Sequence, residues 1–164
     1  MDFVSHTVWG YALFGFRGRP FVALASGALP DVISFGPLVV SHLINGTYRQ
    51  GAPDLATIPA WIFTAYDASH SLVIAALSIG IVARYDKGVA WAMLAWLAHI
   101  FLDFPFHTKA YFPTKLFWPL ADFSVDGVSW GTPAVWFGQL TLLAALLLYR
   151  GWQASSKQLT STRD

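Results

Sequence analysis

The sequence predicts an all-α fold, a polytopic membrane bundle of four to five helices in which the second helix is kinked. Of its 164 residues, 55% are hydrophobic and only 12% are charged, whereas soluble domains have roughly 45–50% apolar and about 25% charged residues. Four stretches carry no charged side chain: residues 32–48, 68–83, 88–102 and 127–149. Because a membrane helix needs about 17–25 mostly apolar residues, these runs favour an integral membrane protein over a soluble helical one.

The composition also limits the chemistry that is available to this chain. It contains no Cys, which excludes disulfides, iron–sulfur clusters and thiolate zinc sites. A net charge of +1 gives no reason to expect a nucleic-acid partner. All nine acidic residues are Asp, so any carboxylate chemistry must use the shorter side chain. We expect one helical membrane domain over residues 1–150 and a frayed, polar C-terminal tail over 151–164.

The first two apolar segments are short or interrupted. Residues 3–16 form an apolar segment that ends at a basic, Gly-containing stretch, and a second segment covers 20–44. Within it, Pro30 lacks an amide donor and disfavours a helical conformation in the preceding residue, which predicts a break near Asp31. Residues 45–59 combine Gly, Pro and Asn and are typical of a loop.

The second half of the chain alternates more regularly between helices and connections. The pattern predicts a helix over about 68–84, a tight turn at 84–88 and a helix over about 89–104. A long aromatic connection with several Pro and Gly residues then covers 105–132. The most apolar segment, 133–149, is the last expected helix.

Basic residues stand at alternate ends of these segments. The groups are Arg17 with Arg19, Arg84 with Lys87, and Arg150 with Lys157. Placing all three groups in the cytoplasm gives a consistent alternation of helix directions. Lys109 and Lys115 then lie outside, which a statistical bias tolerates.

Ionisable residues inside membrane segments are costly and point to a functional site. The sequence places five there: His6, Asp31, His70, His99 and Asp103. Counted along the chain, the first four lie 11 to 14 residues from the nearest basic group, or about 16–21 Å at 1.5 Å per helical residue. They therefore fall in one layer toward the outer side of the membrane, where we expect them to meet.

Their spacing favours a metal site. His99 and Asp103 are four residues apart, so both side chains leave the same helix face, and Asp67 and His70 could share a face at a spacing of three. Imidazole and carboxylate are suitable ligands for zinc and other divalent metals. A metal with an open position can activate a bound water for hydrolysis, and Asp103 or Asp67 could orient that water or accept its proton.

The motifs His6-x-x-x-Gly10, Gly27-Ala-Leu-Pro-Asp31, His70-Ser71 and His99-x-x-x-Asp103 resemble the membrane-bound metal-dependent hydrolase family, which includes a bacterial inner-membrane hydrolase regulated in the DNA-damage response. Their order is similar to that of zinc-dependent phospholipase C. The resemblance implies hydrolysis by a protein of the bacterial inner membrane. We expect a phosphoester as the substrate, and the position of the site toward the outer, periplasmic side favours a lipid-like one.

The resemblance also implies a set of ligands, with Zn as the metal and Mn or Fe as alternatives. These ligands are His6, Asp31, His70, His99 and Asp103, with His107 at the position of a further His. The second His-x-x-x-Glu/Asp pair of phospholipase C is missing, which favours one or two metal ions over three.

Other interpretations of the same residues remain open at this point. Paired histidines could hold a haem, the Asp and His side chains could form an ion or proton relay, or the metal site could be structural and non-catalytic. Individually, His99 and Asp103 could form a structural pair, and Asp31 and Asp67 could each cap a helix. His42 has no partner at a useful spacing.

Overall fold

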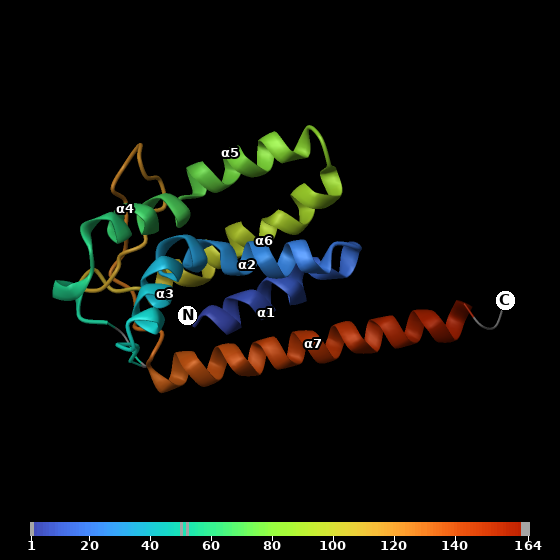
Figure 1. The fold of residues 1–164 in the computed structure, drawn as a ribbon. Coiled ribbons are helices and arrows are strands. Elements are labelled where there is room, and N and C mark those ends of the chain that lie inside the picture. Colours follow the sequence, from blue (N-terminus) through green and yellow to red (C-terminus); the bar gives the residue numbers. More distant parts are fainter. Residues whose placement is uncertain (1, 50, 52, 162–164) are drawn as a thin grey trace.

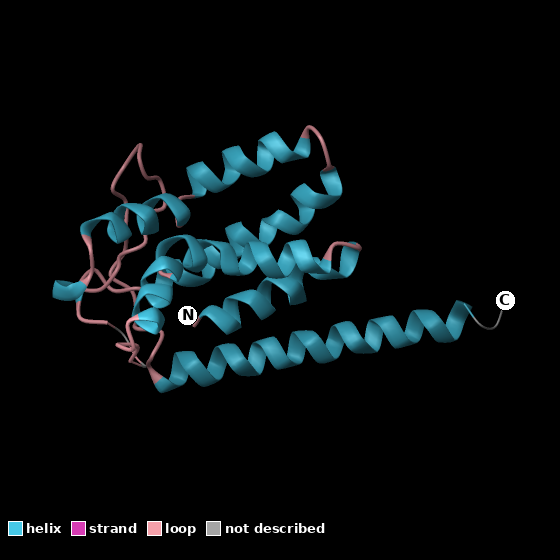
Figure 2. Cartoon of the chain, in the orientation of Figure 1, coloured by secondary structure: helices cyan, strands magenta, loops and turns pink. Residues whose placement is uncertain are grey.

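The computed structural model describes the chain except for residues 1, 50, 52 and 162–164. This part of the chain contains seven α-helices, three short 3₁₀ turns and no β-strand, as the predicted all-α class requires (Figure 2). Five helices run along the long axis of the molecule (Figure 1): α1 (Phe3–Phe14), α2 (Pro20–Ser34), α5 (Leu72–Ala83), α6 (Lys87–Asp103) and α7 (Pro133–Ser161). The short helices α3 (Gly36–Ile44) and α4 (Ala60–Ser69) lie at one end, together with the connection between α6 and α7.

The packing is centred on three helices. Helices α1, α2 and α6 pack against one another, α5 packs on α6, and α7 lies along α1 (Figure 1). Two small clusters of buried apolar side chains complete the core, one around Ile62 and Tyr66 and the other around Trp96 and Ile100. The core is thin, and several large apolar side chains on α5 and α7 are exposed, among them Leu77, Phe137 and Leu142.

The second helix is bent, but not where the sequence indicated. Helix α2 continues through Pro30 and Asp31, and the chain turns by 65° at Phe35 before α3 begins. The predicted break at Asp31 is therefore wrong, and Asp31 caps no helix. The bend lies at Phe35 because the next two residues start a new helix, with Pro37 in its first turn, where a missing amide donor costs nothing.

The helix predicted over about 68–84 is α5, which begins only at Leu72 and is preceded by a separate helix, α4. Helices α4 and α5 meet at 54° across His70 and Ser71. Ser71 caps α5 by accepting hydrogen bonds from the amides of Val73 and Ile74, so the expectation that Asp67 caps this helix is wrong.

The last helix is longer than the apolar pattern suggested. Helix α7 runs from Pro133 to Ser161, so the tail predicted as frayed from residue 151 is helical up to Ser161. Residues 162–164 lie outside the described part.

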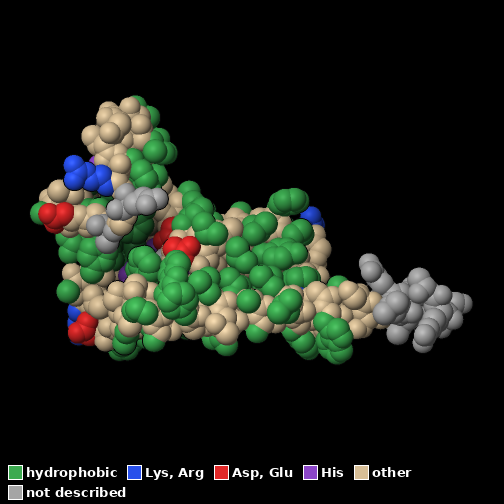
Figure 3. Space-filling view, turned by 90° about the horizontal axis from the view of Figure 1, so that it is seen from below, with side chains coloured by type: hydrophobic (Ala, Val, Ile, Leu, Met, Phe, Trp, Pro, Cys, Tyr) green, Lys and Arg blue, Asp and Glu red, His purple; other side chains and the backbone are tan. Residues whose placement is uncertain are grey.

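The helices are compatible with a membrane by length and composition. Two segments are long and apolar enough to cross a membrane alone, Lys87–Phe106 and Pro133–Ser156. The bent pairs α2 with α3 and α4 with α5 meet the same criterion if each is counted as one broken span, which gives two to four candidate spans. Figure 3 shows hydrophobic side chains over the long helices and charged side chains mainly toward the two ends of the bundle.

The basic groups gather at one end of the bundle, as predicted. Arg17 lies over the ring of Trp91, at 4.0 Å from its centroid, and Arg19 pairs with Asp86 at 3.0 Å. Arg150 of α7 lies 5.5 Å from the ring of a neighbouring Phe16. Helix α7 extends past this end (Figure 1).

Polar contacts attach α7 to α1. Gln139, which is buried, accepts a hydrogen bond from the indole nitrogen of Trp9 at 3.1 Å and donates one to the hydroxyl of Ser5 at 3.2 Å. Replacing Gln139 by Leu is expected to lower the free energy of unfolding by about 0.6–2 kcal/mol, the range for hydrogen bonds between membrane helices. Unfolding of the protein in mixed micelles measures the change.

A matched control is Gln153→Leu, because the hydrogen bond that Gln153 makes to a described residue stays within α7, to the hydroxyl of Tyr149. Equal effects of the two substitutions would contradict the role given to Gln139.

Candidate metal centre

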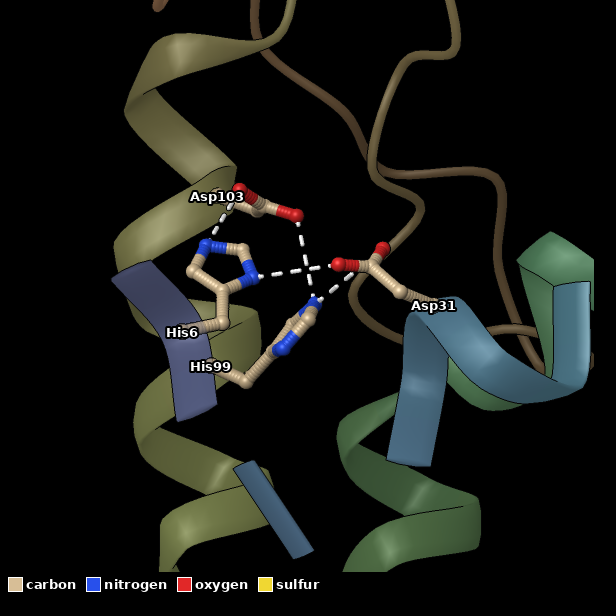
Figure 4. A group of neighbouring side chains, drawn as sticks. All are labelled: His6, Asp31, His99 and Asp103. Carbon is tan, nitrogen blue, oxygen red and sulfur yellow. Dashed lines mark ion pairs between the residues drawn. The ribbon is translucent and has the colours of Figure 1, made fainter. Parts of the chain in front are cut away.

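Side chains from four parts of the chain meet at the end of the long helices that lies next to α3, α4 and the loops. His6 comes from α1, Asp31 from α2, and His99 and Asp103 from α6 (Figure 4). His70 joins them from the junction of α4 and α5. The layer expected from counting residues to the basic end is therefore a cluster in space.

Helix α6 presents two members of this cluster on one face. His99 and Asp103 are each 1% exposed, and His99 Nε2 lies 3.3 Å from Asp103 Oδ2. The predicted spacing of one helical turn is confirmed.

Two glycines bring α1 and α2 close enough for their polar residues to meet. A Cβ atom on Gly27 would lie 2.6 Å from the carbonyl oxygen of His6, and one on Gly10 would lie 2.7 Å from that of Ala23. Only small residues allow helix backbones to approach in this way. The contact sets His6 beside Asp31, with Nδ1 of the ring 3.5 Å from Asp31 Oδ2.

The break between α4 and α5 positions His70. The indole nitrogen of Trp96 donates to the carbonyl of Ser69 at 2.7 Å, and the amide of Leu72 donates to the carbonyl of Leu116 at 2.9 Å. These bonds anchor both sides of His70 and satisfy the polar groups that the broken helix would otherwise leave buried.

Three imidazole rings of the site are oriented by the backbone. Each donates its Nδ1–H to a carbonyl oxygen: His70 to Tyr66 at 3.1 Å, His99 to Gly27 at 2.7 Å and His107 to Phe112 at 2.8 Å. Because a carbonyl oxygen only accepts, these contacts favour a proton on Nδ1, which leaves Nε2 of a neutral ring with a lone pair. Nδ1 of His70 and Nδ1 of His107 also each lie 3.0 Å from a hydroxyl, that of Ser69 and that of Tyr66. Histidines that bind metals show this arrangement, in which the second ring nitrogen donates to a fixed acceptor.

The three Nε2 atoms all face the same carboxylate oxygen. Asp103 Oδ2 lies 3.5 Å from Nε2 of His70, 3.3 Å from that of His99 and 3.5 Å from that of His107. Nε2 of His70 and Nε2 of His99 are 3.1 Å apart. Lone pairs that converge on one another and on a carboxylate repel, and a cation at this position turns the repulsion into attraction.

The separations match those expected of metal ligands. Asp31 Oδ1 lies 3.8 Å from Nε2 of both His70 and His99. Together with Asp103 Oδ2, these four atoms have the recorded separations of 3.1 to 3.8 Å. Ligand atoms at the corners of a tetrahedral zinc site with bonds of about 2.0–2.1 Å are about 3.3 Å apart.

His6 contacts the other oxygen of each carboxylate. Its Nε2 lies 3.0 Å from Asp103 Oδ1 and its Nδ1 lies 3.5 Å from Asp31 Oδ2, yet neither nitrogen forms a hydrogen bond with any described residue. His6, Asp31, His99 and Asp103 each offer a ligand atom within 4.8 Å of the others. The cluster is thus a buried His/Asp group that could hold a metal ion.

Two residues of the cluster are accessible to solvent. The side chain of Asp31 is 16% exposed and that of His107 is 10% exposed, whereas those of the other members are 0 to 2% exposed. His107 also lines a pocket of about 300 Å³, with Phe106, Tyr111 and Trp130 among the other lining residues. A small molecule could therefore approach the site.

Asp67 lies apart from these ligand atoms. Its carboxylate pairs with the ammonium of Lys115 at 2.9 Å, and Asp122 lies 3.5 Å from the same ammonium. The structure therefore brings together every predicted metal ligand but gives Asp67 a different partner. His42 is also remote and bonds to the hydroxyl of Thr47.

The pair between Lys115 and Asp67 predicts a pH dependence of stability. The hydrogen bond to Asp67 raises the pKa of Lys115 above its ordinary value. A raised pKa in the folded state stabilises the fold fully below the ordinary lysine pKa, and this stabilisation is lost as the pH rises through the folded value. We expect Lys115→Gln to lower the free energy of unfolding at pH 7 by no more than about 1 kcal/mol, and to have a smaller effect at pH 11. Unfolding midpoints at both pH values measure the change, and an effect that grows with pH would contradict the assignment.

Sequence reasoning missed the groups that orient the ligands. The ring of Tyr66 stacks on His70 with centroids 3.8 Å apart, and its hydroxyl lies 3.0 Å from both His107 Nδ1 and the hydroxyl of Thr114. The position of Tyr66, one turn before His70 on the same helix face, was the available signal. Backbone carbonyls, such as that of Gly27, leave no signal in side-chain identity.

Comparisons with known protein families, with curated proteins and with solved structures give no match for this chain.

Proposed function

We propose that this chain is a divalent-metal-dependent hydrolase of the membrane, with a phosphoester as its substrate. The observation that carries the proposal is the set of three rings that donate Nδ1–H to the backbone and turn Nε2 toward Asp103. A purely structural His–Asp pair would need only one such ring, with its N–H directed at the carboxylate. The resemblance of the motifs to those of membrane-bound metal-dependent hydrolases supports the same chemistry.

Nitrogen and carboxylate donors suit Zn, and also Mn or Fe. Asp31 and Asp103 each turn one oxygen toward His70 or His99 and the other toward His6. This arrangement would hold one ion among the Nε2 atoms and keeps His6 beside both carboxylates. Two carboxylates also offset most of the charge of the bound cation.

A bound divalent cation polarises a phosphoryl oxygen and lowers the pKa of a bound water to near neutrality. The residues of the chain would then handle the proton. Asp103 would accept it as water adds to phosphorus and the bond to the leaving alcohol breaks, and His6, 3.0 Å from Asp103 Oδ1, would return a proton to the leaving oxygen. Asp67 is held by Lys115, which favours Asp103 over Asp67 as the base.

The pocket beside His107 would bind the substrate. It adjoins the ring whose Nε2 faces Asp103 and combines aromatic faces with the hydroxyls of Thr108 and Ser129. The buried remainder of the cluster excludes water, which strengthens the electrostatic interactions at the reacting group.

Hydrolysis of phosphomonoester and phosphodiester substrates by the purified, metal-loaded protein tests the proposal. We expect Asp103→Asn to lower kcat by at least about 100-fold, as the loss of a general base does. Asp122→Asn is the matched control, because Asp122 is 81% exposed and contacts Lys115, and it should keep full activity. A metal-loaded protein that hydrolyses none of these substrates would instead favour a structural metal site.

A further inference from the structure

Helix α3 is apolar and mostly uncovered, since Leu38 is its one residue that packs against a core cluster of the described residues. None of its nine residues is buried, and Val40, Leu43 and Ile44 are 55%, 59% and 79% exposed. The residues on either side of α3 are uncharged as well, since no charged residue occurs between residues 32 and 48. An uncovered apolar helix of this kind requires an apolar neighbour.

The geometry of the bend shows how far the chain extends from the basic end. Helix α2 has 15 residues and α3 has nine, and the two meet at 65°. At 1.5 Å per residue, α2 covers about 22 Å, and α3 adds only about 6 Å along the same direction. Their joint extent of about 28 Å is close to the roughly 30 Å of a bilayer's hydrocarbon core. Helix α3 would thus lie obliquely within the outer leaflet and end at its surface.

Polar and aromatic residues mark that surface. After α3 the chain continues with Asn45 and an exposed Tyr48, followed by Arg49, and Trp61 at the start of α4 is also exposed. Tyr and Trp concentrate where the hydrocarbon meets the headgroups. The apolar surface of α3 therefore ends where a membrane would end.

The same apolar surface reaches the metal centre. Asp31, the most exposed ligand of the cluster, is followed directly by Val32 and Ile33, which are 47% and 41% exposed. These two side chains connect the accessible edge of the cluster with the uncovered helix α3. A molecule that approaches Asp31 along this edge would come from the lipid and not from bulk water.

We propose that α3 lies in the outer leaflet and that the site takes its substrate laterally, as the phosphate-bearing headgroup of a membrane lipid. The position of α3 is independent of the hydrolase function, whereas the choice of substrate rests on that proposed function. The occupant of the apolar surface is the lipid itself, because α2 and α3 together pass the test for a broken membrane span and the exposed side chains of Val32, Val40 and Leu43 lie along it.

The absence of Cys allows the position of α3 to be tested with single labels. Leu43→Cys and, as a control, Asp122→Cys are labelled with a nitroxide, and the protein is placed in phosphatidylglycerol nanodiscs. Relaxation by oxygen, which concentrates in lipid, is compared with relaxation by a water-soluble nickel complex. We expect Leu43 to be accessible to oxygen and shielded from nickel, and Asp122 to show the reverse. A label at Leu43 as accessible to nickel as that at Asp122 would overturn the proposal.

The choice of substrate is tested with one headgroup in two physical forms. Phosphatidylglycerol in nanodiscs should be hydrolysed with at least 10-fold higher kcat/KM than monomeric dihexanoyl phosphatidylglycerol in water. Leu43→Arg should lower the first rate about 10-fold and leave the second unchanged, with Leu43→Ala as the control for packing. Equal rates on both forms would overturn lateral access and leave the hydrolase proposal standing, whereas no hydrolysis of any phosphoester would overturn the hydrolase and, with it, the lipid substrate.

Discussion

Replacing His99 by Ala is expected to weaken divalent-metal binding by more than about 100-fold. Loss of a residue that merely orients a ligand typically costs about 10- to 100-fold in metal affinity, and His99 is itself placed to be a ligand, with Nε2 3.1 Å from that of His70 and 3.3 Å from Asp103 Oδ2. Elemental analysis after dialysis against a weak chelator measures the change as metal bound per chain.

His42→Ala is the matched control for this experiment. His42 is half-buried, and its side chain bonds to the nearby Thr47, so its loss should leave the metal content unchanged. Circular dichroism and elution volume show whether His99→Ala is folded. A folded His99→Ala protein that keeps its full metal content would contradict the role given to His99.

Adding one methyl group at Gly27 should disturb both the fold and the site. The new Cβ would lie 2.6 Å from the carbonyl oxygen of His6, so α1 and α2 must separate. Overpacking of this kind costs about 1–3 kcal/mol in the free energy of unfolding. The carbonyl of Gly27 also accepts the Nδ1–H of His99, so we expect Gly27→Ala to weaken metal binding about 10-fold or more.

Gly80→Ala separates this effect from the general effect of removing a glycine. Gly80 lies in α5, and a Cβ there would meet nothing within 4 Å. Its replacement should stabilise the helix by up to about 1 kcal/mol and leave metal binding unchanged. Unfolding in mixed micelles and metal titration of both variants give the comparison, and a Gly27→Ala protein that behaves like Gly80→Ala would contradict the close approach of α1 and α2.

The cluster could be predicted from the sequence because the spacing of its residues along single helices is enough to place them. His99 and Asp103 share a helix face by spacing alone, and that pair lies as expected. The common distance of His6 and Asp31 from the basic residues follows from the constant rise of a helix. It survives in the structure because α1 and the 3₁₀ turn after it reach Arg17, and α2 is unbroken from Pro20 to Asp31.

Features that depend on long-range contacts could not be read in the same way. The break at His70 depends on Leu116 and Trp96, which accept from or donate to its neighbours across 27 and more residues. Asp67 was a candidate base at a plausible spacing, but Lys115, 48 residues later, takes its carboxylate. The bend expected at Pro30 lies instead at Phe35, because a proline inside a packed helix can be tolerated when its neighbours satisfy the freed backbone groups.

X-ray absorption spectroscopy of the metal-loaded protein tests the central claim most directly, because it reports the atoms bound to the ion. The arrangement of His70, His99, Asp31 and Asp103 predicts a first shell of nitrogen and oxygen at about 2.0–2.2 Å for zinc, with the multiple-scattering signal of at least two imidazoles. A protein that retains no stoichiometric divalent metal, or one whose metal shows an oxygen shell without imidazole, would contradict the account.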